Sequence, residues 1–352
     1  MTAMHMPCYA VAKTPSCIWK FAILLRNHTM KTAKQLLKVS AVVASLAVSG
    51  MASASLTTFQ TFTGNYGVSS DGWGGTDQSG TISASVPAGA TVVAAYLYSA
   101  MYSSPTAMGD VTLDGTTINS WDQEYTNAIP SVSDTFFRTG RKDVTALVKP
   151  TIDGGPGGVY DFSLRESDSR TDGEALIVVY EMAGLEVSTV AILDGGAALA
   201  GDSTQVNFSD PVDTTDPAFF AEMRLGISFS CCNQKSNVDV NGQLLTNNAG
   251  NNDDGELVAN GSLITMGGYD DDLLNPNAYN EDDERYNLVP FINDGDSKIT
   301  VDTDNPSNDD NIFVALFHVK GEATFTQDVP APAPLALLGL SLCGLFARSR
   351  RK

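Results

Sequence analysis

Between residues 55 and 326, short apolar runs alternate with polar turns, and this pattern predicts one strand after another. Residues 175–180 form a continuous apolar run, which is typical of a strand buried on both faces. Residues 237–245 predict a hairpin, because Asn241-Gly242 separates two apolar arms. Helical periodicity is weak, and only residues 144–148 predict a short helical turn. The other predicted strands are 91–101, 110–118 (with a turn at Asp114-Gly115), 159–164, 185–193, 224–230, 262–266, 297–301 and 312–325.

Many short strands at this spacing indicate an all-β fold, an antiparallel β-sandwich or jelly roll. The predicted body, residues 55–326, is long enough to bury a large core without disulfide bonds. It has no clear internal repeat, and the loop-rich stretch 195–222 is the one candidate for a break between two smaller domains. We expect a further helix on each side of this body, one within residues 30–54 and an apolar one within residues 329–352.

The segment 30–54 has the three parts of a secretory signal peptide. Lys31, Lys34 and Lys38 form a basic region, and residues 39–48 form the apolar core. Ala52 and Ala54 then provide a small-residue cleavage site, which predicts a mature protein that begins at Ser55 after cleavage by signal peptidase. Residues 1–29 fit poorly before this signal and are either an over-extended reading frame or a long leading region.

The C-terminal segment, residues 329–352, also has three parts. A proline-rich stretch, residues 329–334, precedes an apolar run, residues 335–347, and the chain ends in a basic cluster. Counted from Ala331, the apolar run has 17 residues, which is at the short limit for crossing a membrane. Basic residues directly after such a run stay on the cytoplasmic side, so the body would lie on the far side. The alternative is an apolar helix docked on the body.

This tail resembles the PEP-CTERM sorting signal of Gram-negative bacteria. The motif residues are Val329, Pro330, Ala331 and Pro332, with Ala331 where that family usually has Glu. The resemblance implies export, recognition by an exosortase and a transient hold in the inner membrane. It also implies final residence at the cell surface or in an exopolysaccharide matrix.

The body is similar to an uncharacterised group of secreted β-sandwich surface proteins. The similarity is carried by strand-and-turn patterns at residues 88–98, 172–181 and 308–313. It implies placement at the surface or in the matrix and supplies no catalytic residues.

The body is strongly acidic. All 41 Asp and Glu residues lie between Asp71 and Asp328, together with only 11 of the 21 Lys and Arg residues, which gives 11 − 41 = −30. Such a charge repels nucleic acid and anionic lipid, so neither is expected as a partner of the body.

Cysteine and histidine are scarce in the body. Cys231-Cys232 is its only cysteine pair, for which a reduced or structural state, a vicinal disulfide, and an intermolecular bridge or metal site stay open. His318 is its only histidine, which excludes a site with several His ligands to zinc, and its apolar surroundings favour a packed strand residue over a catalytic one. No Gly-x-Ser-x-Gly motif accompanies it.

Several acidic runs have the composition of calcium-binding loops, although none has the EF-hand spacing. The expected donors are Asp302, Asp304, Asp309 and Asp310, because Asp302 and Asp304 share a strand face and the other two start the next strand. Asp282 and Asp283 are the next candidates. Ca²⁺ is the one cofactor that the composition suggests. The alternative is that these runs are solvated loops without an ion.

Trp73 lies in the glycine-rich segment 71–75, which predicts a loop that could present the indole ring to a sugar. The alternative is that the ring packs within the sandwich. The sequence favours an exported, non-enzymatic surface or matrix protein with a structural or adhesive role. The first alternative is a carbohydrate-binding module of the exopolysaccharide matrix. The second is a secreted hydrolase, for which no pair of carboxylates stands out among so many.

Overall fold

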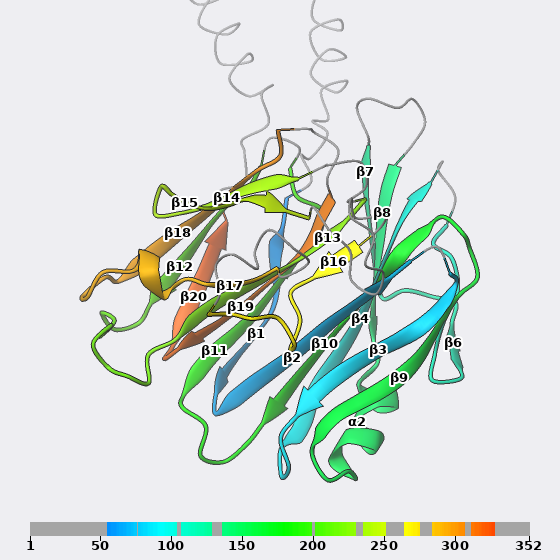
Figure 1. Ribbon diagram of the computed structural model, residues 1–352, viewed down its shortest axis with the longest axis horizontal. Helices are drawn as coiled ribbons and strands as arrows, with labels where there is room; N and C mark the ends of the chain where they lie inside the picture. The colour runs from blue at the N-terminus through cyan, green and yellow to red at the C-terminus, as the bar shows by residue number, and fades with distance from the viewer. Residues whose placement is uncertain are drawn as a thin grey trace, which may run out of the picture. The chain divides into compact units, whose positions relative to one another are not determined.

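The computed structural model describes residues 55–75, 77–103, 107–128, 136–198, 201–229, 235–250, 264–274, 284–306 and 311–327. All of them belong to one compact unit, Ser53–Pro330. Its strands form four antiparallel sheets (Figure 1), which confirms the predicted all-β sandwich class. The signal peptide up to Ala54, Cys231-Cys232 and the sorting motif lie outside the described residues.

Residues 66–181 build the first two sheets, which we call inner sheet 1 and outer sheet 1. Inner sheet 1 has the strand order β2-β10-β4-β8-β7, and outer sheet 1 has the order β3-β9-β5-β6. The strands of these sheets are β2 (Tyr66–Gly74), β3 (Ser79–Val86), β4 (Thr91–Ser103), β5 (Val111–Leu113), β6 (Thr116–Ile118), β7 (Gln123–Ala128), β8 (Phe136–Asp143), β9 (Gly158–Glu166) and β10 (Thr171–Glu181).

The rest of the described chain builds inner sheet 2 and outer sheet 2. Inner sheet 2 has the order β1-β11-β19-β13-β16, with β17 also paired to β13, and outer sheet 2 has the order β15-β14-β18-β12-β20. Their strands are β1 (Thr57–Gly64), β11 (Ser188–Asp194), β12 (Ser203–Phe208), β13 (Ala221–Ser228), β14 (Ser236–Val240), β15 (Gln243–Ala249), β16 (Ile264–Met266), β17 (Arg285–Asn287), β18 (Lys298–Asp304), β19 (Asn311–Lys320) and β20 (Ala323–Gln327).

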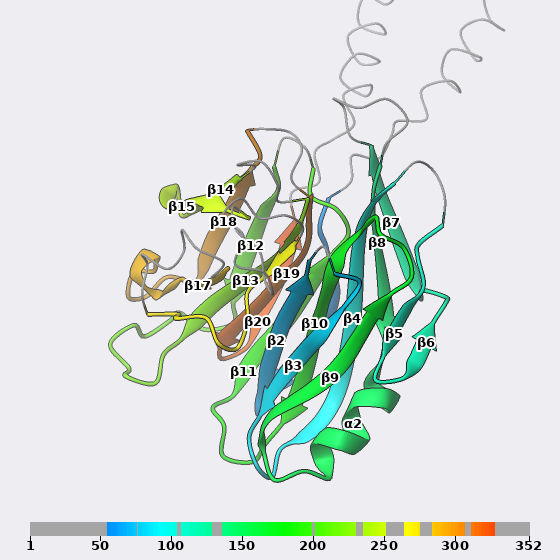
Figure 2. The ribbon, with the colours of Figure 1, turned by 45° about the vertical axis from the view of Figure 1, so that its right-hand side comes forward.

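Three apolar cores separate these sheets into four layers. The first core contains Leu176 of β10, and the second contains its neighbour Ile177. The second core also contains Leu316 of β19, whose neighbour Phe317 belongs to the third core. The order of the layers is therefore outer 1, inner 1, inner 2, outer 2 (Figure 2). This stacking explains the continuous apolar runs, because β10, β11 and β13 of the two inner sheets are buried on both faces.

Inner and outer sheets 1 form the first sandwich, and inner and outer sheets 2 form the second. The first strand of the body, β1, belongs to the second sandwich. β1 pairs with β11, with Phe62 opposite Val190 and Gly64 opposite Ser188. At the start of this strand, Thr58 also meets the last described residue, since the Thr58 amide donates to Gln327 Oε1 at 3.4 Å and Gln327 Nε2 donates to Thr58 Oγ1 at 3.1 Å. The two ends of the folded body are thus hydrogen-bonded to each other.

The predicted turns are confirmed. Asn241 and Gly242, which join β14 to β15, have φ values of 52° and 72°, as a two-residue turn of type I′ requires. Asp114 and Gly115 join β5 to β6 with φ values of 44° and 78°. The helical turn predicted at 144–148 is the start of α2 (Thr145–Asp153), whose Val148 and Ile152 pack into the first core.

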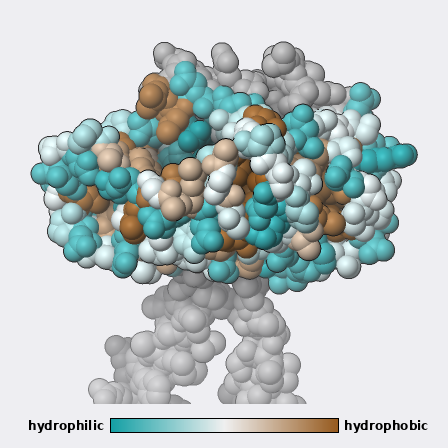
Figure 3. Space-filling view, turned by 90° about the horizontal axis from the view of Figure 1, so that it is seen from below, coloured by the Kyte–Doolittle hydropathy of each residue, from teal (hydrophilic) through white to brown (hydrophobic). Residues whose placement is uncertain are grey.

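Hydrophilic and apolar residues are mixed on the face of the body shown in Figure 3. Seen from below, hydrophilic residues cover much of the body and apolar residues form separate patches among them (Figure 3). No helix within the described residues is long and apolar enough to cross a membrane. The large apolar side chains exposed in the described part of the chain are Tyr102, Val159, Val187, Leu244 and Leu274.

Candidate functional site

Trp73 does not lie on an exposed loop, so the loop prediction is wrong and the alternative, packing within the sandwich, is confirmed. The residue is on β2, its side chain is only 8% exposed, and it packs into the core between inner sheet 1 and outer sheet 1. Gly80 on β3 makes room for the ring, because a Cβ atom there would lie 2.0 Å from indole atoms. The glycines and small polar residues of this segment therefore allow close packing rather than a loop, and the indole has no free face for a sugar.

The predicted calcium donors are only partly described. Asp302 and Asp304 lie on β18, where Asp302 is opposite Asp239 and Asn237 Nδ2 donates to Asp304 Oδ2 at 3.3 Å. Asp309 and Asp310, like Asp282 and Asp283, lie outside the described residues. Across the described ranges, no group of three or more His, Cys, Asp or Glu side chains is arranged to hold a metal ion. The calcium site stays a prediction.

Ser55 is the one described residue of the predicted cleavage site. Its Oγ donates to Asp202 Oδ1 at 2.8 Å, and the amide of Leu56 donates to Asp202 Oδ2 at 3.2 Å. Leu56 is buried in the third core. The predicted first residue of the mature chain thus lies where the chain enters the fold.

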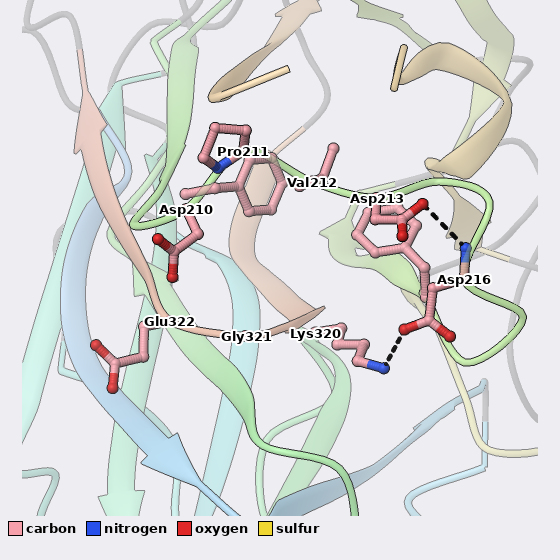
Figure 4. A pocket seen from close by; sticks show the side chains of 10 residues that line it. Asp210, Pro211, Val212, Asp213, Asp216, Lys320, Gly321 and Glu322 are labelled. Atoms are coloured by element: carbon pink, nitrogen blue, oxygen red, sulfur yellow. Dashed lines mark hydrogen bonds and ion pairs between the residues drawn. The ribbon is translucent and has the colours of Figure 1, made fainter. Parts of the chain in front are cut away.

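A pocket of about 200 Å³ opens at one end of the second sandwich (Figure 4). The loop after β12 supplies one wall, and the turn between β19 and β20 supplies the other. Apolar and carboxylate side chains are mixed in the lining. Its residues are Phe208, Asp210, Pro211, Val212, Asp213, Asp216, Phe219, Lys320, Gly321 and Glu322.

The charges of this pocket are unequal. Lys320 is the single cation of the lining against four carboxylates, 1 − 4 = −3. Lys320 Nζ bonds Asp216 at 2.7 Å (Figure 4) and Glu186 at 3.0 Å, and the hydrogen bond with Asp216 raises the Lys320 pKa. The Thr215 hydroxyl donates a hydrogen bond to Asp213 Oδ1 at 2.6 Å, and this bond lowers the Asp213 pKa. The pocket can therefore accept hydrogen bonds from a hydroxyl-rich or cationic ligand, and its lining has no Ser, Thr, Cys or His side chain.

His318 takes part in an arrangement that resembles a catalytic triad. Its Nε2 lies 3.1 Å from Ser188 Oγ on β11, and its Nδ1 lies 3.6 Å from Glu222 Oε1 on β13. Ser188, however, is completely buried and its hydroxyl donates to the Tyr66 carbonyl at 2.9 Å. A nucleophile must be reachable by substrate and must give its proton to the base, so this serine is not placed for acyl transfer.

Glu222 is the centre of a charged network between the two inner sheets. Its Oε1 accepts from Arg224 at 2.7 Å and its Oε2 from Arg285 at 2.7 Å, while Arg224 also donates to Ser70 Oγ at 2.7 Å on β2. Glu222 and Arg224 are each only 3% exposed. Burial alone would raise the pKa of Glu222, but the neighbouring cations, Arg224 first, hold it well below its ordinary value.

A second buried acidic site lies between inner sheet 1 and outer sheet 1. Glu174 on β10 and Glu166 on β9 are 0% and 4% exposed, and their carboxyl groups are hydrogen-bonded to each other. Ser99 Oγ donates to Glu174 at 2.9 Å. Burial raises the pKa of Glu166 to about 8 and that of Glu174 well above its ordinary value, because no cation faces the pair among the described residues.

Sequence patterns gave no signal for these interior sites. Ser188, Glu222 and His318 are far apart along the chain and meet only through the β11-β19-β13 pairing. The pocket around Lys320 was also missed, because its residues come from two turns without a motif. No protein-family model matches the chain, and no curated protein matches it.

Proposed function

We propose that this chain is an exported, non-enzymatic protein of the bacterial surface or exopolysaccharide matrix, with a structural or adhesive role. Signal peptidase removes the segment up to Ala54. An exosortase recognises Val329, Pro330, Ala331 and Pro332 after the C-terminal helix has held the chain briefly in the inner membrane of a Gram-negative cell.

One observation carries this proposal. Thr58 and Gln327 are hydrogen-bonded, so the segments that lead to the signal peptide and to the sorting motif leave the folded body at the same edge. Two membrane-directed segments that start at one edge leave the rest of a folded body free to project away from the membrane. The burial of Ser188 supports a non-enzymatic role, since it takes the one serine bonded to His318 out of reach of a substrate.

Expression of the full chain in a bacterium with an exosortase tests the proposal. We expect mass spectrometry of the product to find Ser55 at the amino end and to find the apolar, arginine-tipped segment removed. The double variant Pro330→Ala, Pro332→Ala should keep that segment, whereas the matched variant Pro334→Ala, outside the four-residue motif, should lose it. An uncleaved product in the cytosol would refute the proposal.

The pocket around Lys320 favours carbohydrate binding as a second candidate function. Phe208 and Phe219 give it apolar walls, while Asp210, Asp213 and Glu322 can accept hydrogen bonds from sugar hydroxyls. A glycan array and titration calorimetry with matrix polysaccharide would test it. We expect Phe219→Ala to weaken binding at least about tenfold, or about 1.4 kcal/mol. The control Phe220→Ala removes the ring that packs on His318, 4.7 Å between centroids, and should leave binding unchanged.

A further inference from the structure

A buried carboxylate lies where the folded body begins. Asp202 directly precedes β12 and is only 8% exposed. One of its oxygens accepts from Ser55 Oγ at 2.8 Å, and the other accepts from the amides of Leu56 at 3.2 Å and Ala198 at 3.1 Å. Its own amide donates to Thr303 Oγ1 at 3.0 Å, which fixes the backbone at this point.

This carboxylate has hydrogen bonds but no cation. Within the described part of the chain, no Lys, Arg or His nitrogen lies within 4.0 Å of Asp202. Burial raises the Asp202 pKa, and its three hydrogen bonds only partly oppose that effect. A buried carboxylate without a counter-ion is costly, so the site favours the arrival of a positive charge.

The charged groups on the neighbouring elements are also acidic. On β18, Asp302 is opposite Ser203 and Asp304 follows two residues later. At the end of β11, Asp194 is opposite Thr57, and that carboxylate is bonded by Arg141. None of these groups supplies a cation to Asp202.

We propose that signal-peptide cleavage supplies this cation: the new α-ammonium group of Ser55 binds Asp202 and fastens β1 to the second sandwich. This inference rests on the proposed function, because that function includes the cut after Ala54. The cut consumes one water molecule, breaks the Ala54–Ser55 peptide bond, and leaves a carboxylate on Ala54 and an ammonium group on Ser55. An uncharged amide with one N–H is thereby replaced by a cation with three donors, on the residue whose hydroxyl already bonds Asp202.

The sign of the pH dependence follows from this pairing. An α-ammonium group has an ordinary pKa of about 8, and a carboxylate partner raises the pKa in the folded state. The stabilisation is then complete below the ordinary pKa and is lost as the pH rises through the folded-state pKa. A chain that keeps residues before Ser55 has no ammonium group at that position. Its stability should therefore not show this fall as the pH rises.

Four proteins with defined amino ends test the inference. Two begin at Ser55 and at Ser53 and keep the natural carboxyl end, and the other two are their Asp202→Asn variants. At pH 6.5 we expect the protein that begins at Ser55 to melt about 2–6 °C above the one that begins at Ser53. The difference should disappear at pH 10 and in the Asp202→Asn pair. Equal melting at pH 6.5, or a difference that persists in the Asp202→Asn pair or at pH 10, would overturn the inference.

A second measurement remains decisive if the Asp202→Asn proteins do not fold. We expect the Ser55 amino group to react with an acylating reagent at pH 7.5 at least about tenfold more slowly in the folded protein than in urea, since its pKa is raised by one unit or more. Equal rates would contradict the ion pair. Because these proteins are made with fixed ends, a negative result leaves the proposed export untouched, and export is decided separately by the mass of the cellular product.

Discussion

Two buried glutamates of this protein have pKa values that are shifted in opposite directions. Glu222, between the two inner sheets, is 3% exposed, and Glu174, between inner sheet 1 and outer sheet 1, is 0% exposed. The pKa of Glu222 lies well below its ordinary value because Arg224 and Arg285 outweigh its burial, whereas burial raises the pKa of Glu174 and the nearby Glu166 raises it further. Burial alone therefore does not decide the charge state of a carboxyl group in this fold.

The two glutamates belong to interfaces that are stabilised in different ways. The interface between the inner sheets uses a charged network in which each carboxylate oxygen of Glu222 meets a guanidinium group. The interface of the first sandwich uses a carboxyl pair that keeps a proton near neutral pH. The first arrangement weakens in acid and the second weakens in base, so the two interfaces have opposite responses to pH.

The largest effect is expected when the Glu222 network loses its charge. Glu222→Gln keeps the shape of the side chain but leaves the buried guanidinium of Arg224 without its carboxylate. We expect the free energy of unfolding to fall by about 3–5 kcal/mol at pH 7, as measured by urea denaturation.

A double variant sharpens this prediction. Glu222→Gln combined with Arg224→Met removes the buried cation as well, so it should recover part of the lost stability. A double variant that is less stable than Glu222→Gln alone would show that Arg224 acts through packing and its bond to Ser70 rather than through Glu222.

A smaller effect of opposite sign is expected at the carboxyl pair. Glu166 and Glu174 bind more protons in the folded state, so wild-type stability should fall as the pH rises from about 4.5 through about 8. Glu174→Gln removes one titrating group, and we expect it to flatten this fall and to be about 1–3 kcal/mol more stable than wild type at pH 9. Denaturation curves at pH 5, 7 and 9 would measure it. A variant whose stability falls as steeply as that of the wild type would contradict the shared proton.

The smallest effect is expected at an exposed ion pair. Lys142 on β8 bonds Asp122 at 2.7 Å, and both side chains are partly open to water. Lys142→Met should change the free energy of unfolding by less than about 1 kcal/mol, and 0.5 M salt should reduce even that. If Lys142→Met lowered the free energy of unfolding as much as Glu222→Gln does, exposure to water would not explain the difference between the Lys142–Asp122 pair and the Glu222 network.

Local patterns predicted much of the fold. The apolar run 175–180 lies within β10, the Asn241-Gly242 turn joins β14 to β15, and residues 144–148 begin α2. β2 was missed because its glycines, serines and Asp71 are typical of loops, and in the folded chain these small residues allow close packing on both faces. A local pattern cannot predict this burial, because burial here depends on how closely the neighbouring layers pack.

The four-layer stack and the interior networks were beyond a local prediction for the same reason. The membership of β1 in inner sheet 2 depends on its pairing with β11, far along the chain. His318 was correctly placed in a packed strand, but its partners Ser188 and Glu222 come from strands that neither precede nor follow it directly. Pairing between distant strands is a property of the whole sequence.

The place of β1 in inner sheet 2 limits the order in which strands can pair as the chain is made. Residues 66–181 emerge as one continuous stretch that contains every strand of the first sandwich. β1 emerges earlier but finds no neighbour until residues 188–194 follow, and closing so long a loop makes this a slow step. Gln327 comes last and bonds Thr58. The second sandwich can therefore close completely only after the last strand of the body has been made.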